Sequence, residues 1–246
     1  MRWALLIRLA ALALLIAFLA EPALFAFAFE PLTTRGEPAI YERTAMLALA
    51  FDHLALVAAA TAAATVVAVG LAILVTRPFG AEFLAVSRSL ANIGQTFPPI
   101  AVLALTVPAL GFGAAPTFVA LFLYGLLPIF ENALAGLTHH DPAVIDAAKG
   151  MGMTPGQRLL QVELPLALPV ILAGIRLSVV VSLATATIGS TVAASTLGEV
   201  IIAGLLSNNV AFVLQGGLVV GALAVLIYDG FVAIERRVAR RAGRLA

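Results

Sequence analysis

The side chains that could take part in chemistry are few, and most of them gather in one polar stretch. The segment DAAKGMGMTPGQRLLQVELP, residues 146–165, contains Lys149, the only lysine among 246 residues. The chain has no cysteine, which excludes disulfides, thiol catalysis and thiolate metal sites. His139 and His140 are adjacent, so their rings would point apart on a helix, and no acidic partner lies at ligand spacing. We therefore predict no metal site, no catalytic residue and no enzymatic activity.

The first half of this polar region reads as a short helix with a cap at each end. Asp141 is a good N-cap, and Pro142 suits the first helical position because its missing N–H needs no partner there. Lys149 complements the negative end of the helix dipole, and Gly150 closes the helix. We expect a glycine turn, GMG at 150–152, to follow.

The second half predicts another short helix directly after that turn. Thr154 can cap it, Pro155 can start it, and Gln157 stands three residues after the cap, as in a capping box. We expect Pro165 to end this helix. Two short helices joined by glycines would form an elbow at the protein surface.

The rest of the chain is apolar enough to cross a membrane several times. Hydrophobic residues make up 62% and charged residues 11% of the sequence, against about 25% charged in an ordinary soluble domain. A span needs roughly 20 apolar residues, and the turn signals in PALGFGAAP, 108–116, divide the longest apolar interval. We predict an all-α polytopic membrane protein with a single domain over 1–246 and about six transmembrane helices near 4–22, 53–76, 91–110, 115–135, 169–193 and 211–234.

The distribution of basic residues predicts that both termini are cytoplasmic, because lysine and arginine are retained on that side. Only Arg35 and Arg43 would then lie outside. The inside group is Arg2, Arg8, Arg77, Arg88, Lys149, Arg158, Arg236, Arg237, Arg240, Arg241 and Arg244. A cleaved signal peptide is the alternative for the first span, but no clean small-x-small site precedes Glu21. The arginine-rich tail is interpreted as an anchor near anionic lipid, so no nucleic-acid partner is expected.

The spacing within the polar stretch resembles the EAA motif of bacterial ABC-importer permeases. Asp146, Ala147 and Ala148 are followed after three residues by Gly152, and after nine more by Val162-x-Leu164-Pro165, with Asp for Glu and Val for Ile. The resemblance implies a type I permease fold in which segment 141–165 is the cytoplasmic coupling helix seated in an ATPase subunit. The coupling residues would be Asp146, Ala147, Ala148, Lys149, Gly150, Gly152, Leu164 and Pro165.

The resemblance also implies that nucleotide is bound elsewhere. The chain has no P-loop, because its one lysine is followed by glycine, so ATP and Mg²⁺ would be bound by the partner ATPase and no cofactor by this chain. The resemblance implies a place in a bacterial inner membrane, in contact with lipid. The implied protein partners are ABC ATPase subunits, a second permease (identical or a sister chain) and an extracytoplasmic substrate-binding protein. The alternatives from other classes are an ATP-independent channel or carrier, and a membrane anchor or sensor.

Further segments look like the permeases of the osmoprotectant uptake family, which import glycine betaine, choline and related quaternary amines. These segments are VTRPFGAEF (75–83), NIGQTFPPIAVLALTVPALGFG (92–113), ALFLYGLLPI (120–129) and STLGEVIIAGL (195–205). The similarity points to the branch with a low-affinity betaine importer. The sequence departs from the family at one place: AAST (193–196) precedes Leu197-Gly198, whereas many members carry a glycine-rich run at these positions. The alternative is a permease for another small solute, such as an amino acid, a sulfonate or a metal chelate.

Two further groups of residues are candidates for substrate passage. The translocation path could be lined near Pro98-Pro99, which must open the helix, by Gln95, Thr96, Phe97 and Tyr124. The alternative is that the aromatic residues only pack against neighbouring helices. Thr196 and Glu199 could form a capping box for a short apolar helix that ends near Ser207 and resembles an outer gate; a surface hairpin is the alternative.

Overall fold

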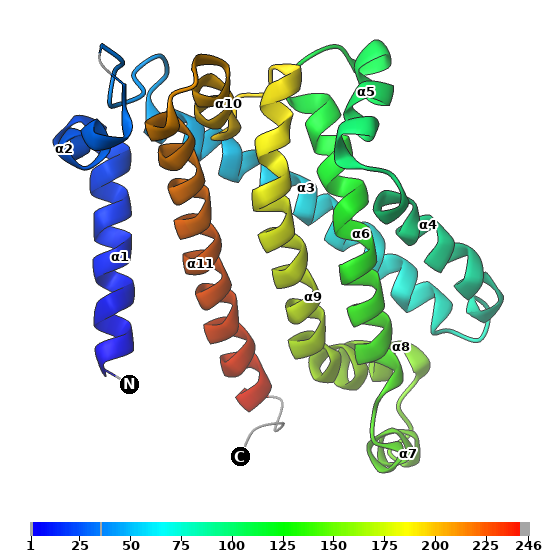
Figure 1. The fold of residues 1–246 in the computed structure, drawn as a ribbon. Coiled ribbons are helices and arrows are strands. Elements are labelled where there is room, and N and C mark those ends of the chain that lie inside the picture. The colour runs from blue at the N-terminus through cyan, green and yellow to red at the C-terminus, as the bar shows by residue number, and fades with distance from the viewer. Residues whose placement is uncertain (1, 35, 242–246) are drawn as a thin grey trace. The chain divides into compact units, whose positions relative to one another are not determined.

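The computed structural model describes residues 2–34 and 36–241, and every regular element in them is a helix (Figure 1). This confirms the all-α prediction. Arg35 and Arg244, on which the predicted orientation partly depends, lie outside the described residues. The long helices are α1 (Arg2–Ala20), α3 (Met46–Val75), α6 (Ala114–Thr138), α9 (Leu164–Thr185) and α11 (Val210–Arg241).

Shorter elements connect the long helices. Between α1 and α3 lie η1 (Pro22–Phe25), α2 (Ala26–Phe29) and η2 (Glu30–Leu32); between α3 and α6 lie η3 (Ala81–Phe83), α4 (Leu84–Thr96) and α5 (Pro99–Leu110). Between α6 and α9 lie α7 (Pro142–Gly150), α8 (Pro155–Arg158) and the π-helix η4 (Leu159–Glu163); between α9 and α11 lie η5 (Ala186–Val192) and α10 (Gly198–Ser207).

Among the described residues, four helical stretches are long and apolar enough to cross a membrane: 46–75, 114–138, 155–192 and 210–240. The number rises to six if two broken pairs, 6–20 with 22–32 and 81–96 with 99–110, each count as one span. The predicted span 91–110 is therefore not a single helix. Phe97 is extended, at φ −101° and ψ 137°, because the residue before a proline is driven out of the helical region.

Contacts group the chain into two compact units. Unit 1 comprises 1–59, 98–121 and 180–227, and unit 2 comprises 60–97, 122–179 and 228–246. Each unit has its own apolar core.

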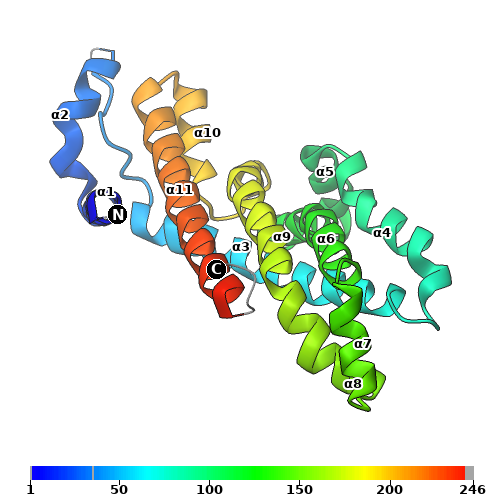
Figure 2. The ribbon, with the colours of Figure 1, turned by 90° about the horizontal axis from the view of Figure 1, so that it is seen from below.

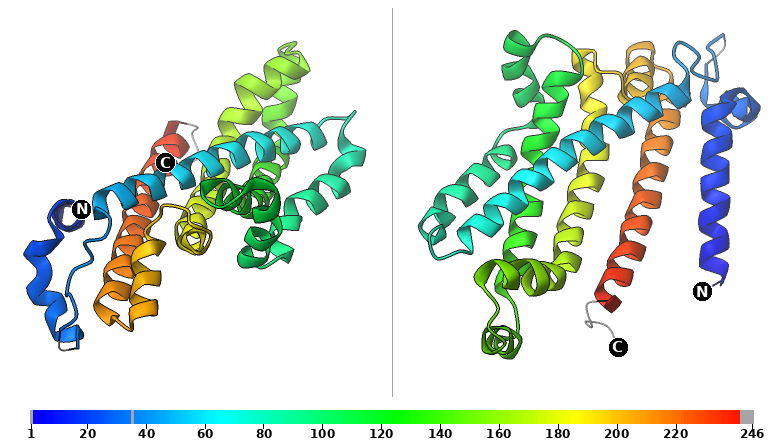
Figure 3. Two further views of the ribbon diagram at one scale, coloured as in Figure 1. Left: turned by 90° about the horizontal axis from the view of Figure 1, so that it is seen from above. Right: turned by 180° about the vertical axis from the view of Figure 1, so that it is seen from behind.

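Unit 1 encloses a polar strap between α2 and α3, which we define as residues 36–45. Gln215 of α11 is fully buried; its amide nitrogen donates to the Ala39 carbonyl at 2.7 Å, and its amide oxygen accepts from the Tyr41 N–H at 3.2 Å. The Asn209 side chain donates to the Pro38 carbonyl at 2.9 Å. These bonds replace the water that the strap's backbone would lose on burial. α10 packs closely along α11 (Figure 3), where a Cβ on Gly216 would come within 2.6 Å of Ile201.

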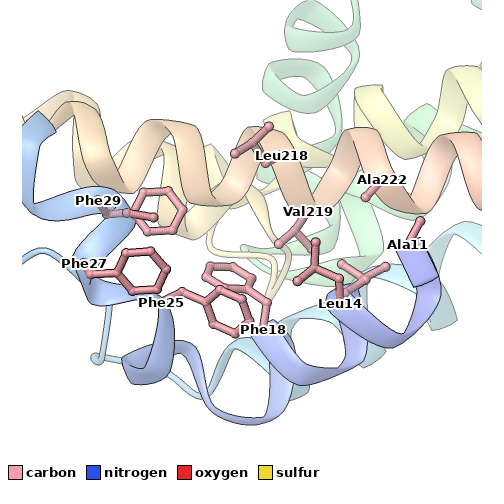
Figure 4. Close-up of a pocket in the computed structure, with 11 residues that line it drawn as sticks. Ala11, Leu14, Phe18, Phe25, Phe27, Phe29, Leu218, Val219 and Ala222 are labelled. Carbon is pink, nitrogen blue, oxygen red and sulfur yellow. The ribbon is translucent and has the colours of Figure 1, made fainter. Parts of the chain in front are cut away.

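An apolar pocket of about 520 Å³ also lies within unit 1. It is lined by α1, the 22–29 segment and α11, and four phenylalanine side chains gather around it: Phe18, Phe25, Phe27 and Phe29 (Figure 4). Phe18 meets Phe25 edge to face, with ring centroids 5.3 Å apart. The lining has no charged or hydroxyl side chain to orient a polar ligand.

Unit 2 is organised around a stripe of alanines on α3. Ala64, Ala68 and Ala72 recur every fourth residue and are fully buried in a core that includes Phe130 of α6 and Ala167 of α9. Small side chains let helix backbones approach closely where lipid gives no hydrophobic drive to associate.

Candidate functional site

The first predicted short helix is present with the predicted ends. The Asp141 carboxylate accepts a hydrogen bond from the Ala143 N–H at 2.9 Å, and Pro142 begins α7. At the other end Gly152 adopts φ +76°, and its N–H donates to the Lys149 carbonyl at 2.9 Å. Only glycine adopts this backbone region at little cost. Both ends of α7 are therefore closed by its own sequence.

The second helix also begins as predicted. The Thr154 N–H donates to the Gln157 side chain at 2.9 Å, and the Gln157 N–H donates to the Thr154 hydroxyl at 3.3 Å, which completes the capping box. The prediction that Pro165 ends this helix is wrong, because the chain continues through η4 into α9. Pro165 directly follows the π turn of η4, where the i→i−4 hydrogen-bond ladder that a proline would break is already interrupted.

The elbow lies beyond the ends of α6 and α9 (Figures 1 and 2). Asp146 and Lys149 are exposed and form an ion pair at 3.2 Å. Ala147 is exposed but Ala148 is buried, so only the first alanine is open to a partner. Gly150, Gly152 and Pro165 are exposed, and Leu164 is half-buried.

One charged residue of the elbow was not singled out from the sequence. Glu163, at the end of η4, is 5% exposed and lies between two arginines. One carboxylate oxygen accepts from the Arg77 guanidinium at 2.5 Å, and the other accepts from Arg158 at 3.1 Å. The signal was present, since a carboxylate inside the apolar run LLQVELP must find a partner if it is buried.

Three of the four predicted path residues come together in unit 2. The Gln95 side chain donates to the Tyr124 carbonyl at 2.9 Å, and the Tyr124 hydroxyl donates to the Phe97 carbonyl. The Phe97 carbonyl is available because the helix breaks there. Thr96 does not join them, since its hydroxyl donates to the Ile93 carbonyl of its own helix at 2.8 Å. A hydrogen-bonded group therefore holds the broken end of α4 against α6.

The capping box predicted for Thr196 and Glu199 is wrong. The Thr196 hydroxyl does accept from the Gly198 N–H at 3.2 Å, but the Glu199 carboxylate bonds to the strap instead. It accepts from the Tyr41 hydroxyl at 2.5 Å and from the Thr44 hydroxyl at 2.7 Å. These two partners from a distant part of the chain displace the local cap.

The long apolar helices are those of a polytopic membrane protein, and the capped elbow joins two of them. The chain belongs to the family described as binding-protein-dependent transport system inner membrane components, whose pattern it matches over residues 68–240. It is a permease subunit of the ABC-importer class, which confirms the resemblance found in the sequence.

Several relatives are named as permeases of solute importers. The chain is 41% identical over 188 residues to the osmoprotectant import permease protein OsmY of Salmonella typhimurium, covering 76% of this chain and 79% of the relative. It is 37% identical over 185 residues to the choline transport system permease protein OpuBB of Bacillus subtilis, covering 73% and 85%. The glycine betaine/carnitine/choline permease protein OpuCB of the same organism is 35% identical over 180 residues, covering 71% and 83%.

The fold is shared with a solved transporter. The inward-facing methionine ABC transporter MetNI superimposes with a TM-score of 0.70 at 22% identity, covering 78% of this chain and 95% of that chain. This likeness supports the type I permease fold.

Proposed function

We propose that this chain is the transmembrane permease subunit of an ABC importer for glycine betaine or related quaternary-amine osmoprotectants. The observation that carries the proposal is the 35–41% identity to relatives named for osmoprotectant, choline, carnitine and glycine betaine transport, which extends over about three quarters of the chain. Transport would proceed by alternating access, driven by a separate ATPase subunit.

The elbow at 141–165 is proposed to receive the motion of that ATPase. Several of its exposed groups are small or short, and Asp146, Ala147, Gly150 and Gly152 would let a partner surface approach the backbone closely. Met151 and Leu160 are exposed beside them and would add apolar contact area. The caps at both ends of α7 allow it to move as a rigid body. Lys149, paired with Asp146, would lie at the rim of the contact, where an exposed ion pair adds little affinity.

The remaining parts of the complex follow from this arrangement. The elbow and both termini would be cytoplasmic, in a bacterial inner membrane, with ATP and Mg²⁺ held by the ATPase and no catalysis by this chain. A second permease subunit would complete the pathway, and an extracytoplasmic binding protein would deliver the substrate.

Gln95, Phe97 and Tyr124 are proposed to contribute to the path, and the α10 region with Thr196 and Glu199 to an outer gate. A quaternary ammonium ion cannot be held by proton transfer, but aromatic ring faces attract it. Phe97 is 48% exposed and remains open to such a contact.

Uptake of radiolabelled glycine betaine tests the proposal in a strain that lacks other betaine importers and expresses this chain with its ATPase, second permease and binding protein. We expect uptake that depends on ATP and on the elbow. No uptake at high external betaine would contradict the substrate and favour another small solute. Full uptake after Gly152→Asp would contradict coupling and favour a channel or carrier.

A further inference from the structure

Glu163 joins the elbow to the end of a different helix. Arg77 follows directly on the last turn of α3, with its N–H bonded to the Leu74 carbonyl at 3.1 Å, whereas Arg158 ends α8. The Glu163 carboxylate accepts from both guanidiniums and is itself almost fully buried. A planar guanidinium holds a carboxylate in a fixed orientation better than a flexible ammonium does. We call these three residues the Glu163 clamp.

The π-helix makes the clamp geometrically possible. Arg158 and Glu163 are five residues apart, and on an α-helix only residues three or four apart are neighbours. A π turn closes with a hydrogen bond between residues five apart, so it places such residues one above the other. η4 covers Leu159–Glu163, which is the interval between the two charges. The wide turn therefore serves the contact between Glu163 and Arg158.

The clamp adds a directional contact to a core face of α3 that is built mostly from small side chains. The fully buried part of that face is the stripe Ala64, Ala68 and Ala72, whose members have no side chain beyond Cβ to interdigitate. Val75 at the end of α3 is the larger side chain buried with them. A smooth stripe allows close approach but resists sliding weakly. A buried charge pair has one good geometry, because leaving either partner unpaired is costly.

We propose that Glu163 is a positioning residue that makes the cytoplasmic end of α3 move together with the elbow when the ATPase displaces it. The proposal rests on the proposed function, in which segment 141–165 is the ATPase contact. Arg77 would receive the displacement and Arg158 would hold the carboxylate in place. Without the clamp, the elbow could still dock and the ATPase could still turn over, but α3 would follow incompletely.

The test compares transport with ATP hydrolysis in the whole complex. This chain, its ATPase and its second permease are reconstituted in vesicles with the binding protein, and radiolabelled glycine betaine accumulated per ATP hydrolysed is measured. For Glu163→Gln we expect the ATPase to co-purify as for wild type and the transport ratio to fall by about fivefold or more, the range of a typical coupling energy. Glu131→Gln is the matched control, since it breaks the half-exposed Arg88–Glu131 pair of the same unit and should leave the ratio within about twofold.

A second variant separates positioning from mere folding. Arg77→Lys keeps the charge but loses the planar guanidinium, one nitrogen of which donates to both Glu163 and Thr76. It should therefore lower the ratio with little loss of protein, and its combination with Glu163→Gln should be no worse than Glu163→Gln alone. The proposal is overturned if Glu163→Gln accumulates as much betaine per ATP hydrolysed as wild type. If Glu163→Gln fails to assemble, an unchanged transport ratio in Arg77→Lys overturns the proposal instead. Equal losses of ATPase activity and transport also overturn it. Failure of the wild-type chain to co-purify with the ATPase would instead refute the proposed function.

Discussion

Gly152 offers a substitution whose effect on the fold can be separated from its effect on a partner. A Cβ at this position would meet no atom of the chain within 4 Å, so only backbone strain opposes a side chain there. With φ at +76°, that strain is about 1–2 kcal/mol, and less for Asp, which tolerates the left-handed region. For a chain of this size, 1 kcal/mol shifts Tm by about 2–4 °C.

Docking should be affected far more strongly than the fold. A carboxylate brought unpaired into a contact costs about 3 kcal/mol or more, which is at least about a hundredfold in affinity. We therefore expect Gly152→Asp to insert normally, to keep Tm within a few degrees of wild type, and to lose both ATPase co-purification and betaine uptake. Detergent pull-down with the tagged ATPase, thermal melts and vesicle uptake measure the three quantities.

Gly36 supplies the control for this prediction. Gly36 lies in the strap and, like Gly152, has a positive φ, here 90°. A Cβ at this position would likewise meet no atom within 4 Å. Gly36→Asp should therefore show a similar small loss of Tm while the ATPase still co-purifies. The reasoning is refuted if Gly152→Asp retains ATPase binding and uptake, or if Gly36→Asp loses ATPase binding to the same extent.

Three further predictions concern unit 1. A Cβ on Gly198 would lie 1.9 Å from the Thr187 carbonyl oxygen, so strain in Gly198→Ala should lower the free energy of unfolding by about 1–3 kcal/mol. An unchanged Tm would refute this packing. Burial and the hydrogen bond to Glu199 raise the pKa of Tyr41 above its usual 10.0. The stabilisation that wild type has over Tyr41→Phe should therefore be complete below pH 10 and decline as the pH rises further. Thermal melts of both proteins between pH 8 and 11 would show a constant difference in Tm if the reasoning fails. Gln215→Leu leaves one buried and one part-buried backbone group of the strap unpaired, at up to about 1–3 kcal/mol each, and should open residues 36–45 to protease. Equal cleavage rates would contradict this prediction.

Local signals in the sequence predicted local structure well. The cap at Asp141 and the capping box of Thr154 with Gln157 both form as expected, because each involves atoms within three residues of one another. The break before Pro98 was also foreseeable, since proline constrains its neighbour regardless of the fold. The EAA-like spacing was sufficient to indicate the family.

Predictions failed where a distant residue competed with a local one. Glu199 could cap its own helix, but Tyr41 and Thr44 bind its carboxylate from more than 150 positions away. Pro165 was expected to end a helix, but the π turn directly before it already interrupts the i→i−4 ladder, and the helix continues through the proline. Neither outcome can be read from a window of neighbouring residues.

The sequence by itself determined that this chain is an all-α membrane permease and where its elbow lies, because apolar run lengths, caps and motif spacing act over short distances. Only the tertiary structure decided that Glu163 is buried between Arg77 and Arg158. That contact depends on the close packing of α3 in unit 2 and on one π turn, and burial then makes the pairing of the carboxylate obligatory.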